Sequence, residues 1–365
     1  MKKLIYIILI AIFTVGCNQA NQPDYVDANS FIYLSASAEN STTSRAPYEY
    51  TTPNESTDGV LQAAVWASTN SLQYLNKGWN GKNNGTNVAI HAGASFENGE
   101  PQLLSEAVYP QQGNPVYFVG FHPQTGWTTP SGDEEGKSAS YTFNGSQDVM
   151  FAKRIEGTYA DPNAGTTTLN VRPLVFMHLL TWLKLKIKAE NQNALDAWGK
   201  IRDIKIISKN QVTVDLNKET FVHFDTLETT SVHFSNETQL PFYVTESDNV
   251  FPTSDGYSMK FDSEEVAYVL CSPVVAKVPY YEAGVLKFPH EYQLYIKTDY
   301  REVTLEIDLI KKNATSTAEA VYFEGSTRSR SFTLNLVFKM GNTIMVSADV
   351  VDWELGGSGT GDLGE

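Results

Sequence analysis

Apolar and basic residues alternate strictly in Leu183-Lys-Leu-Lys-Ile-Lys188. A period of two residues is typical of a β-strand that has one buried face and one solvent face. Just upstream, residues 171–180 are more continuously apolar. We therefore expect one long strand here, which begins covered on both sides and ends with only its leucine and isoleucine face in a core.

The same alternation recurs through the rest of the chain, while helical periodicity is nearly absent. Clusters of Gly, Pro and Asn separate the alternating segments, at spacings typical of β-sandwiches. The candidate strands are residues 60–72, 87–96, 116–122, 139–152, 221–234, 240–245, 265–278, 291–298 and 303–310. The expected fold class is therefore all-β.

Two hairpins and one short helix complete this prediction. Residues 201–207 and 211–216 predict one hairpin, and residues 331–339 and 343–355 predict another, joined around Gly341-Asn342. The polar stretch 190–199 contains a candidate turn of helix at residues 194–198.

The length of 365 residues suggests two domains of ordinary size. We place the boundary in the polar stretch after residue 190, which predicts an N-terminal β-sandwich over residues 28–190 and a C-terminal one over residues 191–355. The Gly-rich residues 356–365 predict a flexible tail.

The first residues predict a lipoprotein signal peptide over residues 1–16. Lys2 and Lys3 precede an apolar run that Thr14 alone interrupts, and Gly16 stands just before Cys17. The run is too short for an ordinary transmembrane helix. Acyl chains on Cys17 would then hold the protein on a membrane, with residues 17–27 as a polar tether. A plain secretory signal is the alternative.

Residues 31–39 alternate again and predict a first strand with one buried face. The residues expected on that face are Ile32, Leu34, Ala36 and Ala38. Small polar residues follow, with Arg45 as the single basic residue before Pro47. A trypsin-like protease could cut after Arg45 and leave Ala46 as a new N-terminus, because segments of this composition are preferred nicking sites. The alternative is that Arg45 is an ordinary loop cation.

Charge and cysteine content narrow the function classes. Removing residues 1–16 takes away two lysines and no acid, so the formal charge of −15 becomes −17 in the mature chain. Such acidity argues against nucleic acid as a partner. If Cys17 carries lipid, Cys271 is left alone, and no intrachain disulfide can form.

No catalytic motif stands out. The sequence has neither His-Glu-x-x-His nor Gly-x-Ser-x-Gly, and its six histidines show no helical metal-ligand spacing. His178 lies in an apolar segment and is expected to be a hydrogen-bonded core histidine. Residues 133–135 are acidic and could hold calcium, although a solvated loop fits their spacing better. We expect no enzyme, no cofactor and no metal. A β-sandwich glycosidase is the enzyme alternative, since its two carboxylates would meet only in space.

Two tryptophans lie in loop-like surroundings, Trp79 beside Gly78 and Trp127 beside Gly126. Either could stack on a sugar ring or on another protein. The alternative is that such aromatics fold back as a lid over one end of a sandwich.

Three segments, taken in this order behind the candidate lipid site, carry a resemblance. They are Ser146-Gln-Asp-Val-Met-Phe-Ala152, Val171-Arg-Pro-Leu-Val-Phe-Met-His-Leu-Leu180 with the alternating strand after it, and Asn342-Thr-Ile-Met-Val-Ser-Ala-Asp-Val-Val-Asp-Trp353 followed by Glu-Leu-Gly-Gly. Jointly they resemble the fimbrillin family, the lipoprotein pilin subunits and Mfa-like proteins of Bacteroidales surfaces. The resemblance spans nearly the whole mature chain.

This resemblance implies two tandem transthyretin-like β-sandwich domains on a surface-exposed protein, anchored by lipid in the outer membrane. It also implies assembly into a fimbria by strand exchange with other pilin subunits. In polymerising members a trypsin-like protease cuts after an Arg past the first strand, and the vacated groove accepts a strand of the next subunit. Arg45 stands where that cut would fall.

The tail departs from the pattern of stalk pilins. Residues 356–365 lack the alternating apolar residues of a long donor strand, which favours a tip, accessory or anchor role over a stalk. The adhesion target would be a host or bacterial surface protein or glycan. The alternative function is a surface glycan-binding lipoprotein of a polysaccharide-utilisation system.

Overall fold

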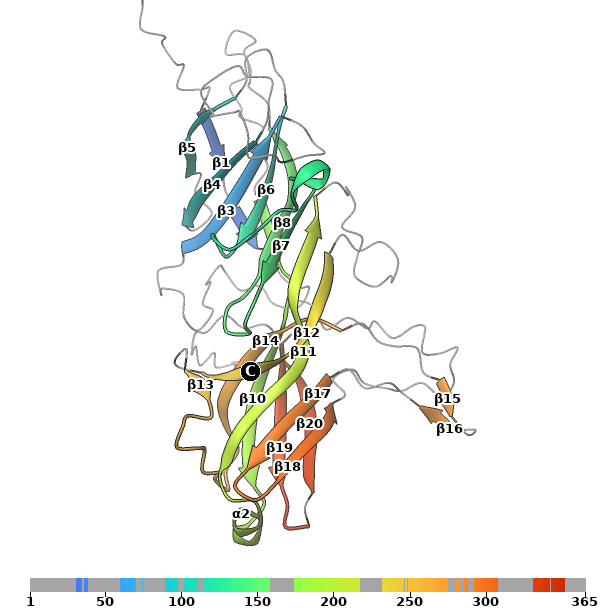
Figure 1. Ribbon diagram of the computed structural model, residues 1–365. Helices are drawn as coiled ribbons and strands as arrows, with labels where there is room; N and C mark the ends of the chain where they lie inside the picture. The colour runs from blue at the N-terminus through green and yellow to red at the C-terminus, as the bar shows by residue number, and fades with distance from the viewer. Residues whose placement is uncertain are drawn as a thin grey trace, which may run out of the picture.

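The computed structural model describes the β-rich parts of the chain. These are residues 31–34, 36–38, 60–69, 74, 89–97, 102–109, 115–157, 174–216, 232–245, 247, 249–274, 280–282, 285–287, 292–307, 331–341 and 343–351. The expected all-β fold class is confirmed, because strands dominate this part and its only helical elements are the 3-10 turn η3 (Gly132–Glu134) and the helix α2 (Gln192–Trp198) (Figure 1). No helix within it is long and apolar enough to cross a bilayer.

A six-stranded sheet and a two-stranded ribbon make up the upper part of the molecule (Figure 1). The sheet has the order β2 (Ala36–Ala38), β9 (Leu174–His178), β8 (Met150–Gly157), β6 (Val116–His122), β3 (Val60–Ser68) and β4 (Ala89–Glu97). The ribbon pairs β1 (Phe31–Leu34) with β5 (Gln102–Val108). All these pairs are antiparallel except β2 with β9.

Most of a ten-stranded sheet forms the lower part, and its strand β7 (Ser138–Thr142) is drawn higher, beside β6 and β8 (Figure 1). Its main order is β18 (Glu302–Ile307), β17 (Tyr292–Thr298), β11 (Ile201–Asp215), β12 (Val232–Val244), β14 (Glu264–Cys271), β10 (Thr181–Ala189), β19 (Ser331–Phe338) and β20 (Ile344–Val351). Beside it, β7 (Ser138–Thr142) pairs with β11 and β13 (Val250–Phe251) pairs with β12. A separate ribbon joins β15 (Tyr280–Glu282) to β16 (Val285–Lys287).

Two clusters of buried side chains hold these sheets. The small core joins Leu34 to one face of the six-stranded sheet, including Phe118 and Phe176. The large core begins on the opposite face, at Trp66 and Phe121, and continues through the ten-stranded sheet. β6 contributes to both cores, so nearly all its residues are buried. This explains why its sequence reads as an almost continuous apolar run.

The opening alternation is confirmed in β10. Leu183, Leu185 and Ile187 are fully buried, and the lysine that follows each of them is half-buried on the other face. The expected single long strand is wrong, however, because β9 and β10 belong to different sheets. The chain crosses between them at Leu179-Leu180, and both residues are fully buried. Two successive apolar residues break the alternation, which suits a crossing that is covered from both sides.

The expected hairpin between residues 201–207 and 211–216 is also wrong. Both segments belong to the single 15-residue strand β11, and its pairing with β12 continues through Lys209 opposite Glu237. The intervening residues contain no Gly or Pro that would close a tight turn. The irregularity lies across the ladder instead, where Asn236 takes a positive φ of 58°.

The closing hairpin is confirmed, with eight consecutive pairs between β19 and β20. The helix is confirmed as well: the Asn191 side chain accepts a bond of 3.0 Å from the amide of Ala194 and caps α2. At the other end of α2, the indole of Trp198 donates to the carbonyl of Lys339 over 2.8 Å. α2 is thus fixed to the sheet that follows it.

The boundary expected after residue 190 remains a prediction about folding units. By strand pairing, β7 and β10 precede that boundary yet lie in the ten-stranded sheet. The large core also includes side chains from both sheets. The two parts of the chain are therefore interleaved.

Gly120, in the middle of β6, leaves room for the aromatic ring of Phe176. A Cβ at this position would stand 2.5 Å from the ring and 3.1 Å from the Cβ of Ala152. Because Phe176 is fully buried, it has little space to yield.

We expect Gly120→Ala to lower the free energy of unfolding by about 1–3 kcal/mol through overpacking. The matched control is Gly93→Ala in β4, where the close neighbour is the end of the flexible Gln124 side chain, which can swing aside. Urea unfolding of both variants is the measurement. Equal losses would contradict the packing described for Phe176.

Candidate functional site

The stretch 31–38 contacts both upper sheets within eight residues. Its first part, β1, pairs antiparallel with β5, from Phe31 opposite Val108 to Leu34 opposite Gln102. Its second part, β2, pairs parallel with β9, from Ala36 opposite Leu174 to Ala38 opposite Phe176. One short stretch therefore supplies the outer neighbour of two strands. Both pairings are only three or four residues long, so each involves few ladder hydrogen bonds.

Leu34 fixes this stretch in the small core. Its side chain is 1% exposed and lies in the same cluster as Phe118, Met150 and Phe176. Leu34 is therefore a core residue of this part of the molecule. Ile32, Ala36 and Ala38 lie in the described strands, but their side chains lie outside the described part of the structure.

Two strands depend on the stretch 31–38 for an outer neighbour. β9 pairs with β8 on its inner side, and β2 is the neighbour on its outer side. β5 pairs with β1 and with no other strand that the structure describes. Without β1 and β2, the edges of β5 and β9 would flank the fully buried Leu174 and Phe176. The stretch therefore pairs with the edges of both strands and adds Leu34 to the small core beside them.

Tyr109 ties the end of β5 to the small core. Its ring meets that of Phe118 edge to face, at 6.4 Å between centroids. The hydroxyl lies against Gly157, where a Cβ would stand 2.5 Å from it. Burial raises the pKa of Tyr109 above its ordinary value of 10.0. These two contacts, with Phe118 and Gly157, join β5 to β6 and β8.

His178 and Asp148 tie down the end of β9 in a similar way. Nδ1 of His178 lies in hydrogen-bond contact with Oδ2 of Asp148, and both side chains are largely buried. Oδ1 of Asp148 accepts a bond of 2.8 Å from the amide of Val149, and the carbonyl of Val149 accepts one of 2.8 Å from Leu179. This agrees with the prediction of a hydrogen-bonded core histidine at position 178.

Asp148 is a partner that the sequence did not reveal. Both residues occur in the segments that carry the resemblance to fimbrillins, but 30 positions separate them. Only the pairing of β8 with β9, in which Met150 stands opposite His178, brings the two residues together. The one signal in the sequence is a carboxylate directly before an apolar run, which suggests a buried acceptor.

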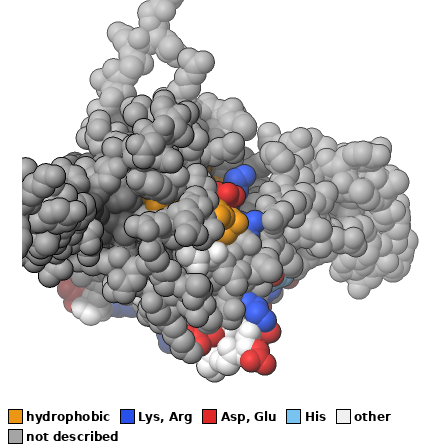
Figure 2. Space-filling view, turned by 90° about the horizontal axis from the view of Figure 1, so that it is seen from above, with side chains coloured by type: hydrophobic (Ala, Val, Ile, Leu, Met, Phe, Trp, Pro, Cys, Tyr) orange, Lys and Arg blue, Asp and Glu red, His pale blue; other side chains and the backbone are white. Residues whose placement is uncertain are grey.

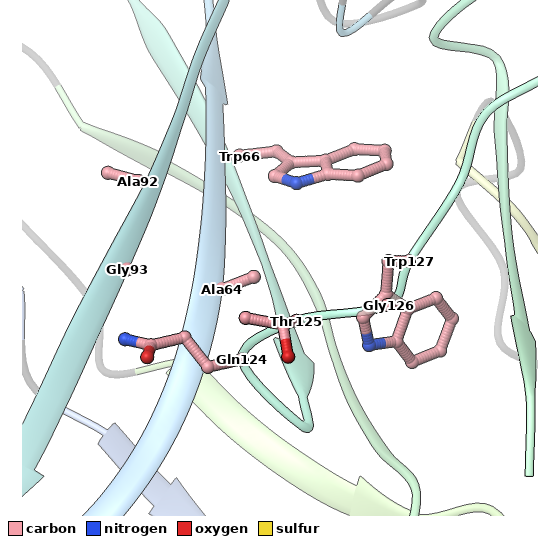
Figure 3. A pocket seen from close by; sticks show the side chains of 8 residues that line it. All are labelled: Ala64, Trp66, Ala92, Gly93, Gln124, Thr125, Gly126 and Trp127. Carbon is pink, nitrogen blue, oxygen red and sulfur yellow. The ribbon is translucent and has the colours of Figure 1, made fainter.

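Trp127 lines an open cleft beside β3 and β4 (Figure 3). The cleft has a volume of ≈ 380 Å³, and Trp66, Gln124, Thr125 and Gly93 also line it. In Figure 3 the two indoles stand on one side of it, and Gln124 extends toward Gly93 on the other.

The ring of Trp127 is already well packed. Its centroid lies 4.7 Å from that of Phe121 and 5.3 Å from that of Tyr141, and its indole donates to the carbonyl of Pro123 over 3.0 Å. Trp127 is thus half-buried and folds back over the sheet, as the lid alternative expects. One part of its surface still borders the cleft.

The charged side chains around η3 form an ion pair and no metal site among the described residues. Asp133 and Glu134 are exposed around η3, and Lys137 contacts Glu134 at 3.0 Å. Within the described residues, no group of three or more His, Cys, Asp or Glu side chains could hold a metal ion. Seen from the N-terminal end, the described surface shows a small hydrophobic area bordered by charged side chains (Figure 2).

Four of the residues singled out by the sequence lie outside the described residues. They are Cys17, Arg45, Ala46 and Trp79. Lipid attachment, cleavage and a binding role for Trp79 therefore stay predictions.

Comparison with known proteins gives likeness of fold. No family model matches the chain, and no curated protein matches it. A candidate cell adhesion protein of Bacteroides uniformis has 13% sequence identity and a TM-score of 0.47, over 90% of this chain and 100% of that chain. A second one, of Bacteroides ovatus, has 12% identity and a TM-score of 0.47, over 91% and 100%.

The fimbrial anchor protein Mfa2 of Porphyromonas gingivalis is also similar, with 9% identity and a TM-score of 0.41. The match covers 88% of this chain and 97% of that chain. Because the likeness is one of fold alone, a function has to be argued from the residues and strand pairings of this chain.

Replacement of Leu34 by Ala tests how firmly the first stretch is held. We expect Leu34→Ala to lower the free energy of unfolding by about 2–5 kcal/mol, because it leaves a cavity in the small core. Leu34→Met keeps the volume and should cost less than about 1.5 kcal/mol. Urea unfolding measures both. A negligible loss for Leu34→Ala would show that the small core does not need this side chain.

Tyr109 predicts a pH dependence of stability. A raised pKa in the folded state means that the folded protein keeps the phenolic proton longer than the unfolded chain does. The contribution is therefore complete below about pH 10 and is lost as the pH rises further. We expect Tyr109→Phe to reduce the loss of stability between about pH 10 and 12 in urea unfolding.

Tyr300→Phe is the matched control, because the Tyr300 side chain is 69% exposed. It should leave the pH profile of the wild type unchanged. An unaltered profile for Tyr109→Phe would refute the role given to burial of Tyr109.

Proposed function

We propose that this protein is a non-enzymatic, fimbrillin-type surface lipoprotein that takes part in a pilus and in adhesion. Cys17 is the lipid attachment site and holds the mature chain in the outer membrane. Residues 31–38 are a removable first strand, and other pilin subunits bind by donating a strand to the trench that it leaves. The partner at the far end is a surface protein or glycan of a host or another bacterium.

One observation carries this proposal: residues 31–38 complete two sheets at their edges through short pairings. An interior strand could not leave without breaking a sheet in two. An edge stretch can leave while β9 keeps its pairing with β8. The trench would then present an extended main-chain edge, which is what β-strand addition requires.

The free energy that residues 31–38 contribute is large enough for such an exchange. Burying a leucine side chain contributes about 1.5–3 kcal/mol, and each ladder hydrogen bond contributes about 1 kcal/mol net. Loss of the stretch would remove a large share of the 5–15 kcal/mol that typically stabilises a domain. A vacated trench should therefore bind a suitable strand strongly, and an intact one should remain closed.

Contacts of Tyr109 and His178 would keep β5 and β9 in place after the first strand leaves. Tyr109 packs on Phe118, and His178 contacts Asp148; neither contact involves residues 31–38. The walls could thus keep their places while the first strand is exchanged. Without such anchors, the loss of β1 and β2 would let the small core collapse.

A tip, accessory or anchor subunit fits this chain better than a stalk subunit. A stalk subunit must accept a strand and also donate one. The Gly-rich residues 356–365 lack the alternating apolar residues of a donor strand. The protein would then receive a strand, end a pilus or join it to the membrane.

Limited digestion with trypsin tests the exchange. We expect one early cut, after Arg45, and a large fragment that begins at Ala46. Multimers should follow when purified pilin subunits are added, because release of residues 31–38 opens the trench and the tail of this chain lacks a donor strand. N-terminal sequencing and size-exclusion chromatography are the measurements.

Arg45→Ala is the control and should keep the chain whole in the same digestion, with its oligomeric state unchanged. A cut at Arg45 without any multimers, even when purified pilin subunits are added, would count against strand exchange.

The cleft beside Trp127 favours a second candidate, a surface glycan-binding lipoprotein of a polysaccharide-utilisation system. Its indole, amide and hydroxyl groups are suited to a sugar ring. This protein would stay monomeric after digestion, and polysaccharide in an affinity gel would retard it.

A further inference from the structure

β20 is an open edge of the ten-stranded sheet. It pairs with β19 over eight residues without a register shift, and no other strand that the structure describes pairs with it. In an antiparallel ladder, alternate residues turn their N–H and C=O groups away from the neighbour. β20 therefore presents a regular row of backbone donors and acceptors on its outer side.

The large core is incompletely covered at this edge. The core-facing residues of the adjacent β19, Phe332, Leu334, Leu336 and Phe338, are at most 1% exposed. Those of β20, Ile344, Val346 and Ala348, pack on the same core but are only half-buried. Another strand beside β20 would cover them.

β20 also lacks the features that protect sheet edges. Its sequence Ile344-Met-Val-Ser-Ala-Asp-Val-Val351 has one charged residue and contains neither Pro nor Lys. Its pairing has no bulge, and Met345 is 51% exposed. The opposite edge of the same sheet, β18, has the exposed glutamates Glu302 and Glu306. One edge is thus protected by charge and the other is not.

We propose that β20 pairs with β20 of a second copy of this chain. The two strands run antiparallel with Ser347 opposite Ser347, so that the ten-stranded sheets of two molecules become continuous. Directly opposite residues in such a ladder share a face. Val346 then stands opposite Ala348, and position 344 opposite position 350. Apolar residues of the core side meet apolar residues.

Charge supports a second copy as the occupant. In this register Asp349 stands opposite Met345, and the two copies of Asp349 are four positions apart along the ladder. The same symmetric pairing of β18, centred on Thr304, would put Glu302 directly opposite Glu306. Opposed like charges destabilise a strand pair. Self-pairing is thus favourable at β20 and unfavourable at β18.

This dimer is separate from the strand exchange proposed at residues 31–38. It adds a strand to an intact sheet, requires no cut at Arg45 and involves the other part of the molecule. Either proposal can fail while the other holds.

Analytical ultracentrifugation of the mature chain, residues 17–365 with Cys17→Ser, tests the dimer without protease. We expect a concentration-dependent dimer. Ser347→Lys should abolish it, because two lysines would face each other at the centre of the ladder. Thr304→Lys is the matched control, with the same charge change at an equally exposed position of β18. It should leave the dimer unchanged.

Cross-linking tests the register. Cα atoms of opposite residues lie about 4.5–5.5 Å apart, within the range that a disulfide spans. We expect Ser347→Cys to give a covalent dimer on oxidation. Met345→Cys should not, because its two copies would be about 13 Å apart along the ladder. Cys271 is buried and is left in place in both variants. A monomer at every concentration, a dimer indifferent to Ser347→Lys, or a failure of Ser347→Cys to cross-link would overturn the proposal.

Discussion

The structure depends on the requirement that every strand has its backbone groups paired while its apolar face is covered. In the upper part, a stretch of eight residues meets this requirement for two sheets at once, because β1 pairs with β5 and β2 pairs with β9. The stretch is short, and each of its two pairings includes few backbone hydrogen bonds. The same few residues therefore complete both sheets.

The two edge strands of the ten-stranded sheet, β18 and β20, each have one side whose backbone groups pair with no described strand. β18 has glutamates on its exposed face, which oppose pairing with another copy. β20 has almost no charge, and its core-facing residues are only partly covered. The two edges of one sheet thus differ in charge and in how fully their core-facing residues are covered.

Much of the fold could be predicted from local pattern. The alternation in β10, the closing hairpin and the capped helix α2 all follow from residues close in sequence, because side-chain period, turn residues and caps act over a few positions. The errors lie where pattern is ambiguous. Leu179-Leu180 read as the middle of a strand but is a crossing between sheets, and residues 208–210 read as a turn but continue β11.

The sequence by itself determined the all-β class, the core position of Leu34 and the candidate lipid and cleavage sites at Cys17 and Arg45. Only the tertiary structure decided that residues 31–34 and 36–38 join different sheets, that Asp148 meets His178, and that Trp127 lies on Phe121. The reason is physical. Alternation records that a strand has a buried face, but strand partners are chosen by backbone bonds and packing between residues far apart in sequence, which leave no local mark.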